Sequence, residues 1–280
     1  MAEHLLSLQG GKRVIDLNEK TWIMGILNVT PDSFSDGGLF TNIEKAVAHA
    51  KQMKADGADF IDIGGESTRP GYTPVSLQEE LDRVIPVIRE VAAKVDLPIS
   101  IDTYKAETAR QALEAGASII NDVWGAKADP GMASVAAEYD VPIILMHNRH
   151  NTNYKDLMTD MIADLRESIE TVLRAGVKEE NIVLDPGIGF AKTYEQNLEA
   201  MDRLEELTEL GYPVLLGTSR KSIVSQTLHL PKEERVEGTG ATVCLGIEKG
   251  CHIVRVHDVL PIKRMTTMMD AMLKRMPAPL

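Results

Sequence analysis

Short runs of apolar residues recur along the chain, and each is followed by a longer stretch with helical spacing. Eight such runs begin near residues 21, 59, 98, 118, 141, 181, 213 and 252. They are nearly continuous rather than alternating, which is typical of parallel strands buried on both faces. Eight strands, each followed by a helix, predict an α/β fold, a (β/α)8 TIM barrel. A doubly wound open sheet would show the same order, but no GxGxxG follows the first run.

The flanking segments refine this architecture. The stretch GKRVIDLNEKT, residues 11–21, has the pattern of a short N-terminal hairpin before the barrel. Ser76 followed by Glu79 resembles a capping box and marks a helix start. No Ser- or Gly-rich linker and no internal repeat interrupts the pattern, so we expect one domain over residues 1–280.

Charge narrows the class of partner. The chain carries 42 acidic against 30 basic residues, a net charge of −12. Proteins that bind nucleic acid or anionic membranes usually present a basic surface, so neither partner is expected. Residues 1–13 lack an apolar segment behind a basic start, and no apolar run approaches about 18 residues, which predicts a cytoplasmic protein. Cys244 and Cys251 are expected to be free thiols.

Polar residues gather after the predicted strands, whereas the residues before the strands are blander. In a barrel, the loops at the carboxyl ends of the strands form the active site. For any single position, capping of the following helix explains a polar residue equally well. Repetition after every strand favours a ligand site. The residues concerned are Asn28, Glu66, Thr68, Arg69, Asp102, Asn121, Asp122, His147, Asn148, Asp185, Lys221, Arg255, His257 and Asp258.

The mixture of these side chains restricts the ligand. Asp102, Asn121 and Asp185 offer mainly acceptors, which suits a planar heterocycle with several N–H groups. Cationic residues follow strand 7 and lie on strand 8, where barrels often bind phosphate. The two sets together indicate a nitrogen heterocycle that carries a phosphate or pyrophosphate. Lys221 could alternatively be a Schiff-base lysine, and His147 with His150 could suggest a metal site, although a satisfied strand-end histidine is favoured.

With these residues in view, the chain closely resembles the bacterial dihydropteroate synthases. The segments ILNVTPDSFSDGG and GGESTRPG are similar to the two mobile loops of that family. ISIDTYK, IINDVWG, LDPGIGFAK, GTSRKS and VRVHDV match the rest of its pattern in order, from about residue 22 to residue 260. The resemblance implies a transferase of folate biosynthesis. Such an enzyme condenses 6-hydroxymethyl-7,8-dihydropterin pyrophosphate with p-aminobenzoate, giving 7,8-dihydropteroate and pyrophosphate.

The resemblance also implies roles for individual residues. The pterin would be held by Asp102, Asn121, Asp185 and Lys221. Asn28 would help to coordinate Mg²⁺ on the pyrophosphate, with Arg255 and His257 on the anion, and the residues implied to be catalytic are Asp102, Lys221, Arg255 and His257. The p-aminobenzoate side, where sulfonamides bind in this family, would be formed by Thr68, Arg69, Pro70, Phe190 and Ser222. A homodimer is consistent with the family, and the methionines of the last helix are a candidate contact.

The implied reaction gives the first loop a purpose. Departure of pyrophosphate leaves a cation on the pterin methylene, which must be shielded from water until the amine arrives. We therefore expect Pro31, Asp32, Phe34 and Asp36, with Thr68–Pro70, to form a lid, although Phe34 could equally be a surface aromatic. Two other functions are considered: a pterin-binding methyltransferase of similar barrel type, and a pterin-binding module without catalysis. The first does not explain the STRPG loop, and the second predicts loss of residues that are present.

Overall fold

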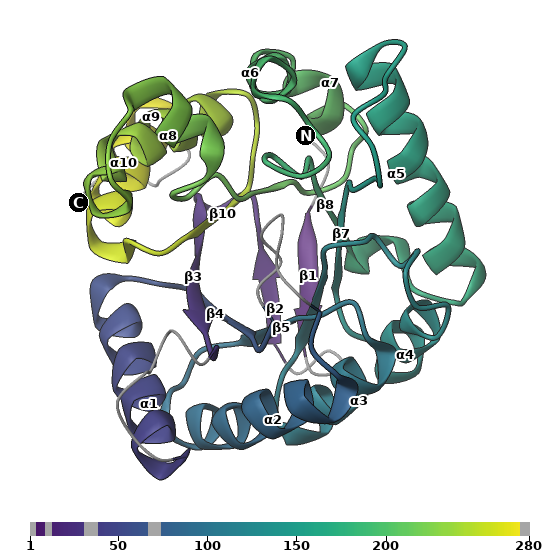
Figure 1. Cartoon of the computed structure of the whole chain (residues 1–280), viewed down its shortest axis with the longest axis vertical. Coiled ribbons are helices and arrows are strands. Elements are labelled where there is room, and N and C mark those ends of the chain that lie inside the picture. The colour runs from purple at the N-terminus through teal and green to yellow at the C-terminus, as the bar shows by residue number, and fades with distance from the viewer. Residues whose placement is uncertain (1–3, 9–12, 31–38, 67–73, 275–280) are drawn as a thin grey trace.

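The fold is a closed barrel of parallel strands surrounded by a ring of helices (Figure 1). The computed structural model describes residues 4–8, 13–30, 39–66 and 74–274. Within them the barrel strands are β3 (Trp22–Asn28), β4 (Phe60–Gly64), β5 (Ile99–Asp102), β6 (Ile119–Asp122), β7 (Ile143–Met146), β8 (Ile182–Asp185), β9 (Leu215–Leu216) and β10 (Ile253–Val256). Their order in the sheet is β8-β7-β6-β5-β4-β3-β10-β9, and a parallel bridge between Leu184 and Val214 closes the ring. The predicted TIM barrel is confirmed.

Helices follow the strands as the sequence pattern predicts. Ser76 begins one of them, because its side chain accepts a hydrogen bond from the Glu79 amide at 3.2 Å. The helices are α1 (Leu39–Asp56), α2 (Leu77–Lys94), α3 (Ala106–Ala115), α4 (Met132–Tyr139), α5 (Leu157–Arg174), α6 (Tyr194–Asp202), α7 (Glu205–Thr208), α8 (Ser222–Leu228), α9 (Val236–Glu248) and α10 (Val259–Met272).

Two predicted helices are each divided in the structure. The helical stretch that begins at Tyr194 is split into α6 and α7 after Asp202. The stretch from Ser222 to Lys249 is split into α8 and α9, because His229 adopts a left-handed conformation and Pro231 cannot continue a helix. Neither division changes the order of strands around the barrel.

The N-terminal hairpin closes the end of the barrel where the strands begin. β1 (Leu5–Leu8) pairs with β2 (Arg13–Asp16) in antiparallel register. Buried Leu6, Leu8, Ile15 and Leu17 pack with the barrel's interior residues, which are Met24, Phe60, Ile119, Ile144, Val183, Leu215 and Ile253. The predicted hairpin is confirmed, but its first strand lies before residues 11–21, where the sequence pattern placed it.

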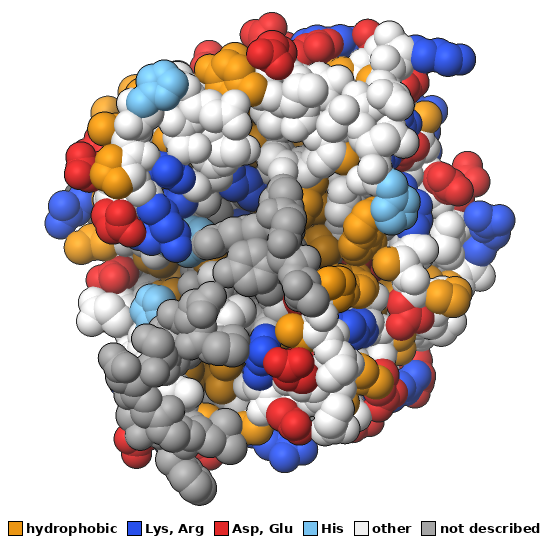
Figure 2. Space-filling view, viewed as in Figure 1, with side chains coloured by type: hydrophobic (Ala, Val, Ile, Leu, Met, Phe, Trp, Pro, Cys, Tyr) orange, Lys and Arg blue, Asp and Glu red, His pale blue; other side chains and the backbone are white. Residues whose placement is uncertain are grey.

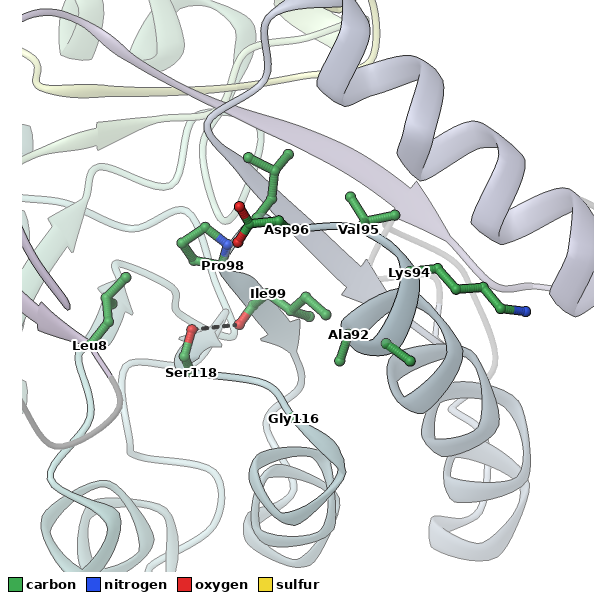
Figure 3. A pocket seen from close by; sticks show the side chains of 11 residues that line it. Leu8, Ala92, Lys94, Val95, Asp96, Pro98, Ile99, Gly116 and Ser118 are labelled. Atoms are coloured by element: carbon green, nitrogen blue, oxygen red, sulfur yellow. Dashed lines mark hydrogen bonds between the residues drawn. The ribbon is translucent and has the colours of Figure 1, made fainter. Parts of the chain in front are cut away.

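A small cavity also lies at this end of the barrel, at the junction of α2, β5 and the loop before β6 (Figure 3). It has a volume of about 320 Å³, and its lining includes Leu8, Pro98, Ile99 and Ser118. Ser118 donates a hydrogen bond to the Ile99 carbonyl at 3.5 Å, while Lys94 extends away from the other side chains in the view. The lining shows no grouping of reactive side chains, so the chemistry must be sought at the other end of the strands.

The surface carries charged side chains of both signs. Acidic and basic side chains are interspersed around the face shown in Figure 2. Among the described helices, none combines the length and the apolar character needed to span a membrane. Cys244 and Cys251 are not joined by a disulfide bond.

Candidate active site

The carboxyl ends of the barrel strands carry the polar residues that the sequence singled out. The parallel register sets Asn28 of β3 opposite Gly64 of β4, and Gly64 opposite Asp102 of β5. Asp102 is in turn opposite Asn121 of β6, while Asp185 ends β8. These side chains therefore lie at one level around the barrel mouth, as predicted.

A buried network of four side chains occupies this mouth. Arg255 donates from Nε to Asp62 Oδ2 at 2.5 Å and from Nη2 to Asp102 Oδ2 at 2.6 Å. Asn121 donates from Nδ2 to the same Asp62 oxygen at 3.1 Å. Asp62, Asn121 and Arg255 lie on β4, β6 and β10, and alternate strands supply the side chains of one layer inside such barrels. The network fixes the guanidinium and the amide in single orientations.

Two carboxylate oxygens in this network lack partners. Asp62 Oδ1 and Asp102 Oδ1 are buried and accept no hydrogen bond from the described residues. An unpaired buried acceptor is costly, and in a binding site it indicates where a ligand donor belongs. Burial raises the pKa of Asp102 to about 7, against the opposing effect of Arg255. The mouth thus offers acceptors to a ligand that carries N–H groups.

Lys221 approaches the mouth from the loop after β9. Its Nζ donates to the Ile188 carbonyl at 2.6 Å and lies 4.6 Å from the centre of the Phe190 ring. Burial lowers the pKa of Lys221 to about 8, and the charge of Asp185 opposes this shift. Burial also raises the pKa of Asp185. A Cβ atom at Gly217 would lie 3.8 to 3.9 Å from atoms of Lys221, Asp185 and Arg255, so these three side chains converge there.

The loops after β9 and β10 are tied to each other. Ser219 Oγ accepts from the His257 amide at 3.1 Å and lies 3.0 Å from His257 Nδ1. Arg220 forms a two-bond ion pair with Asp258, at 2.9 and 2.5 Å. Arg220 is thus paired with Asp258, whereas Lys221 of the same loop lies near Gly217 with Asp185. The expected catalytic set of Asp102, Lys221, Arg255 and His257 is thus brought to one end of the barrel.

Other predicted residues are placed less completely. Phe190 lies in the loop after β8, and Ser222 is the first residue of α8. Thr68, Arg69 and Pro70 lie outside the described residues, as do Pro31, Asp32, Phe34 and Asp36 of the expected lid. The segment that precedes residues 67–73 is anchored, because Glu66 accepts from Lys105 Nζ at 2.6 Å and from the Tyr104 hydroxyl at 2.9 Å.

Sequence reasoning missed Asp62. It stands inside the apolar run DFIDI, which was treated only as a buried strand. A carboxylate in the middle of such a run needs a buried partner, and that requirement was the available signal. The two histidines have separate partners: His147 contacts Asp164 and Lys192, and the centre of the His150 ring lies 4.7 Å from that of Trp124 in a tilted arrangement.

A cleft of about 810 Å³ opens beside the mouth. It lies between the loops after β4, β5, β6, β7 and β8, and its lining includes Glu66, Tyr104, Trp124, Arg149 and Phe190. This volume is in the range of sites for small organic ligands. The buried acceptors, the cationic loop and an adjoining cleft therefore form a site for a small polar heterocycle.

Comparison with known proteins identifies the reaction that this site catalyses. Residues 24–257 match the family of pterin binding enzymes. A dihydropteroate synthase from Bacillus subtilis (strain 168) is 61% identical over 279 residues, which are 98% of each chain. The chain belongs to the dihydropteroate synthase family. The predicted recognition is confirmed, and the chain is a transferase that makes 7,8-dihydropteroate from the pterin pyrophosphate and p-aminobenzoate.

Solved structures of other dihydropteroate synthases agree with the fold. The enzyme from Clostridium difficile, determined in the presence of pteroic acid, is 54% identical with a TM-score of 0.91, over 92% of this chain and 98% of that one. The Xanthomonas albilineans synthase with 4-aminobenzoic acid is 42% identical with a TM-score of 0.91, over 97% and 98% of the two chains. These similarities make the methyltransferase and non-catalytic alternatives unnecessary.

Proposed function

We propose that the barrel mouth of this synthase holds the dihydropterin ring among Asp102, Asn121, Asp185 and Lys221. The observation that carries the proposal is the convergence of Lys221, Asp185 and Arg255 around Gly217, where Arg255 also bonds to Asp62 and Asp102, whose second carboxylate oxygens are buried without partners among the described residues. The carboxylates would accept from ring N–H groups, and Lys221 would donate to a ring acceptor. Asp62 would orient Asn121 and Arg255 through one oxygen, and its unpaired Oδ1 would be a further acceptor for the ligand.

The p-aminobenzoate would bind where the mouth meets the protein surface. Phe190, in the loop after β8, lies 4.6 Å from Lys221 Nζ, and Ser222 follows Lys221 at the start of α8. Thr68, Arg69 and Pro70 would complete this side, together with the lid residues of the first loop. The Xanthomonas albilineans structure with 4-aminobenzoic acid supports a benzoate of this kind as the second substrate.

The departing pyrophosphate would be received by Arg255 and His257. Two nitrogens of Arg255 bond to carboxylates, which leaves Nη1 to face an anion. Mg²⁺ keeps several waters and binds through few protein oxygens plus substrate phosphates, and Asn28 offers one amide oxygen at the same level of the barrel. No group of three metal-binding side chains occurs in the described residues, which fits a metal carried largely by the substrate. Bound Mg²⁺ would neutralise charge on the pyrophosphate.

The chemistry exchanges one bond for another at the pterin methylene. The C–O bond breaks, and its electron pair leaves on the pyrophosphate oxygen. The amine of p-aminobenzoate then forms the C–N bond and loses a proton to solvent or to the released anion. Ionised Asp102 and Asp185 would stabilise the cationic pterin, while Arg255 would stabilise charge on the leaving oxygen. We propose that departure largely precedes attack, with the two loops excluding water from the cation.

The test measures pyrophosphate release from the pterin pyrophosphate with p-aminobenzoate and Mg²⁺. Asp185→Asn should reduce kcat/KM by about 100-fold, because a charged partner of the pterin is lost. Asp82→Asn alters an exposed carboxylate on α2 and should leave kcat/KM unchanged. Equal activity of Asp185→Asn and wild type would contradict the proposed pterin site. Slow cleavage without p-aminobenzoate would support early departure, and strict dependence on the amine would oppose it.

We further propose that the enzyme forms a homodimer through α10. Leu260, Met268 and Met272 are exposed on this helix, by 41%, 59% and 56%. Exposed apolar side chains on one helix are typical of an interface. Light scattering should give a dimer mass for the wild type and a monomer mass for Met268→Glu/Met272→Glu. A dimer that survives both substitutions would place the interface elsewhere.

A further inference from the structure

A buried lysine, Lys192, lies near the end of the loop that follows β8. Lys192 is only 9% exposed, and its Nζ contacts three acceptors. It donates to the carbonyls of Gly187 and Phe190 at 3.1 and 3.2 Å, and it lies 2.9 Å from His147 Nδ1. The contacts are directed at the backbone of the loop rather than at the barrel mouth, so the mechanism above makes no use of them.

The loop has an unusual backbone that presents carbonyls on two sides. Gly187, Gly189 and Ala191 have φ angles of 65°, 84° and 46°, in the left-handed region. The carbonyls of residues 187 and 190 meet Lys192, whereas the carbonyl of Ile188 accepts from Lys221 at 2.6 Å. Two lysines therefore hold this loop: Lys192 bonds to the carbonyls of residues 187 and 190, and Lys221, in the site, bonds to the carbonyl of Ile188.

A second contact of His147 determines which of its two ring nitrogens is the acceptor for Lys192. His147 Nε2 lies 3.0 Å from Asp164 Oδ2, and Asp164 is also bonded by Arg149. Despite partial burial, these hydrogen bonds hold the pKa of Asp164 below its usual value, so its carboxylate accepts and His147 Nε2 carries the proton. His147 Nδ1 is then a lone-pair acceptor for Lys192 Nζ. Burial lowers the pKa of His147 to about 4, which keeps the ring neutral in this arrangement.

We propose that Lys192, oriented by His147 and Asp164, is a positioning residue that holds the loop after β8 and thereby places the Phe190 ring and Lys221. The two donors of Lys192 fix the carbonyls on either side of Ile188, so the Ile188 carbonyl and the Phe190 ring keep their places beside Lys221 Nζ. Asn197 of α6 adds a second anchor, since its Oδ1 accepts from the Gly189 amide at 2.6 Å. The inference rests on the proposed function, because Phe190 is assigned there to p-aminobenzoate.

The position of the Phe190 ring can be followed directly. The chain has four phenylalanines, so protein labelled with 4-fluorophenylalanine should give four ¹⁹F resonances, and Phe190→Leu identifies one of them. In Lys192→Met the Phe190 resonance should shift or broaden, while that of Phe60, in the barrel interior, should not. The KM for p-aminobenzoate should rise at least tenfold, with a smaller change in kcat. Lys178→Met, at an exposed ion pair with Asp140, should change neither quantity.

The outcomes separate positioning from simple stabilisation. A folded Lys192→Met protein with an unchanged Phe190 resonance and a KM within twofold of wild type would overturn the proposal. If that variant does not fold, Lys192→Gln keeps a neutral NH2 donor group on a shorter side chain and should give a smaller shift and a smaller rise in KM. Failure of both to fold would assign Lys192 to stability instead. Because the ¹⁹F readout needs no ligand, it remains informative even if Asp185→Asn proved fully active and so refuted the proposed pterin site.

Discussion

At the scale of single residues, Asp62 organises the barrel mouth without facing the cleft. It has no exposed surface, and one of its oxygens accepts from both Asn121 and Arg255. Because a carboxylate only accepts, the Asn121 side chain must turn its NH2 toward Asp62, and its oxygen becomes the acceptor for a ligand. Although burial opposes the charged form, Asp62 and Asp102 raise the pKa of Arg255. Its charge is therefore fixed at every pH of interest.

Replacing Asp62 tests this role. Asp62→Asn should lower kcat/KM by about 100-fold, because a buried and hydrogen-bonded charge pair is broken. The charge of Asp62 also helps to raise the pKa of Asp102, so that pKa should fall in the variant. Steady-state kinetics against pH measure both effects. Asp59→Asn offers a control on the loop before the same strand: Asp59 pairs with Lys20 at 2.5 Å, and its loss should affect stability but not kcat/KM.

The expected pH profile of the activity follows from the shifted pKa values of Asp102 and Lys221. Asp102 must be ionised to stabilise the cation, so kcat/KM for the pterin pyrophosphate should rise with pH through about 7. Lys221 must be protonated to donate, so kcat/KM should fall above about 8. Lys221→Arg stays protonated throughout and should lose the falling limb. An unchanged falling limb in Lys221→Arg would assign that limb to another group.

The residues that sequence reasoning found and missed differ in one respect. Asp102 and Asp185 end their strands and Asn121 is the last residue but one of β6, so the rule that barrel sites lie at carboxyl ends was sufficient to select them. Asp62 lies inside a strand, and Lys192 belongs to a loop motif whose other members drew attention. Their roles depend on contacts across the barrel, Asp62 with Arg255 and Lys192 with His147, which no local pattern specifies.

At the scale of elements, the strands were predicted well because apolar runs bounded by polar residues are strong signals. β9 has only two residues and is shorter than the apolar run that predicted it. The division of the helical stretch from Tyr194 into α6 and α7 was not predictable, because no Gly or Pro marks it. The hairpin's first strand, β1, was missed because it lies before residue 11, outside the stretch in which the sequence pattern placed the hairpin.

Gly217 directly follows the short strand β9 and offers a test of where the pterin ring binds. A Cβ there would make ordinary contacts of 3.8 to 3.9 Å with the protein, so Gly217→Ala should fold with a melting temperature near that of wild type. The methyl group would nevertheless enter the space where we place the pterin ring. We expect about tenfold weaker binding of a pterin ligand, measured by calorimetry. Undiminished pterin affinity in a folded Gly217→Ala protein would move the ring away from this strand.

At the scale of the whole molecule, stability and chemistry occupy opposite ends of the barrel. The N-terminal hairpin covers the end where the strands begin, and the polar network lies where they finish. This separation is general for the fold. The single-domain boundary, the cytoplasmic location and the absence of nucleic-acid binding stay predictions.

The separation predicts a mutation that affects stability alone. Leu6 is 1% exposed beneath the barrel, so Leu6→Ala should lower the free energy of unfolding by about 3 kcal/mol. Denaturant titration measures this loss, and kcat/KM at 25 °C should stay within about twofold of wild type. Leu5→Ala, at a neighbour that is 39% exposed, should change little in either measurement. A large loss of activity in folded Leu6→Ala would show that the two ends are coupled.

The carboxylate oxygens of Asp62 and Asp102 that lack partners influence which compounds could bind in place of the pterin. A flat molecule with the right outline but an edge of C–H groups would fit the space and still seal both oxygens from water. Sites built to accept hydrogen bonds reject such isosteres far more strongly than apolar pockets reject a misfit of one methylene. An effective inhibitor of this half of the site must therefore copy the donor pattern of the heterocycle, and shape alone will not suffice.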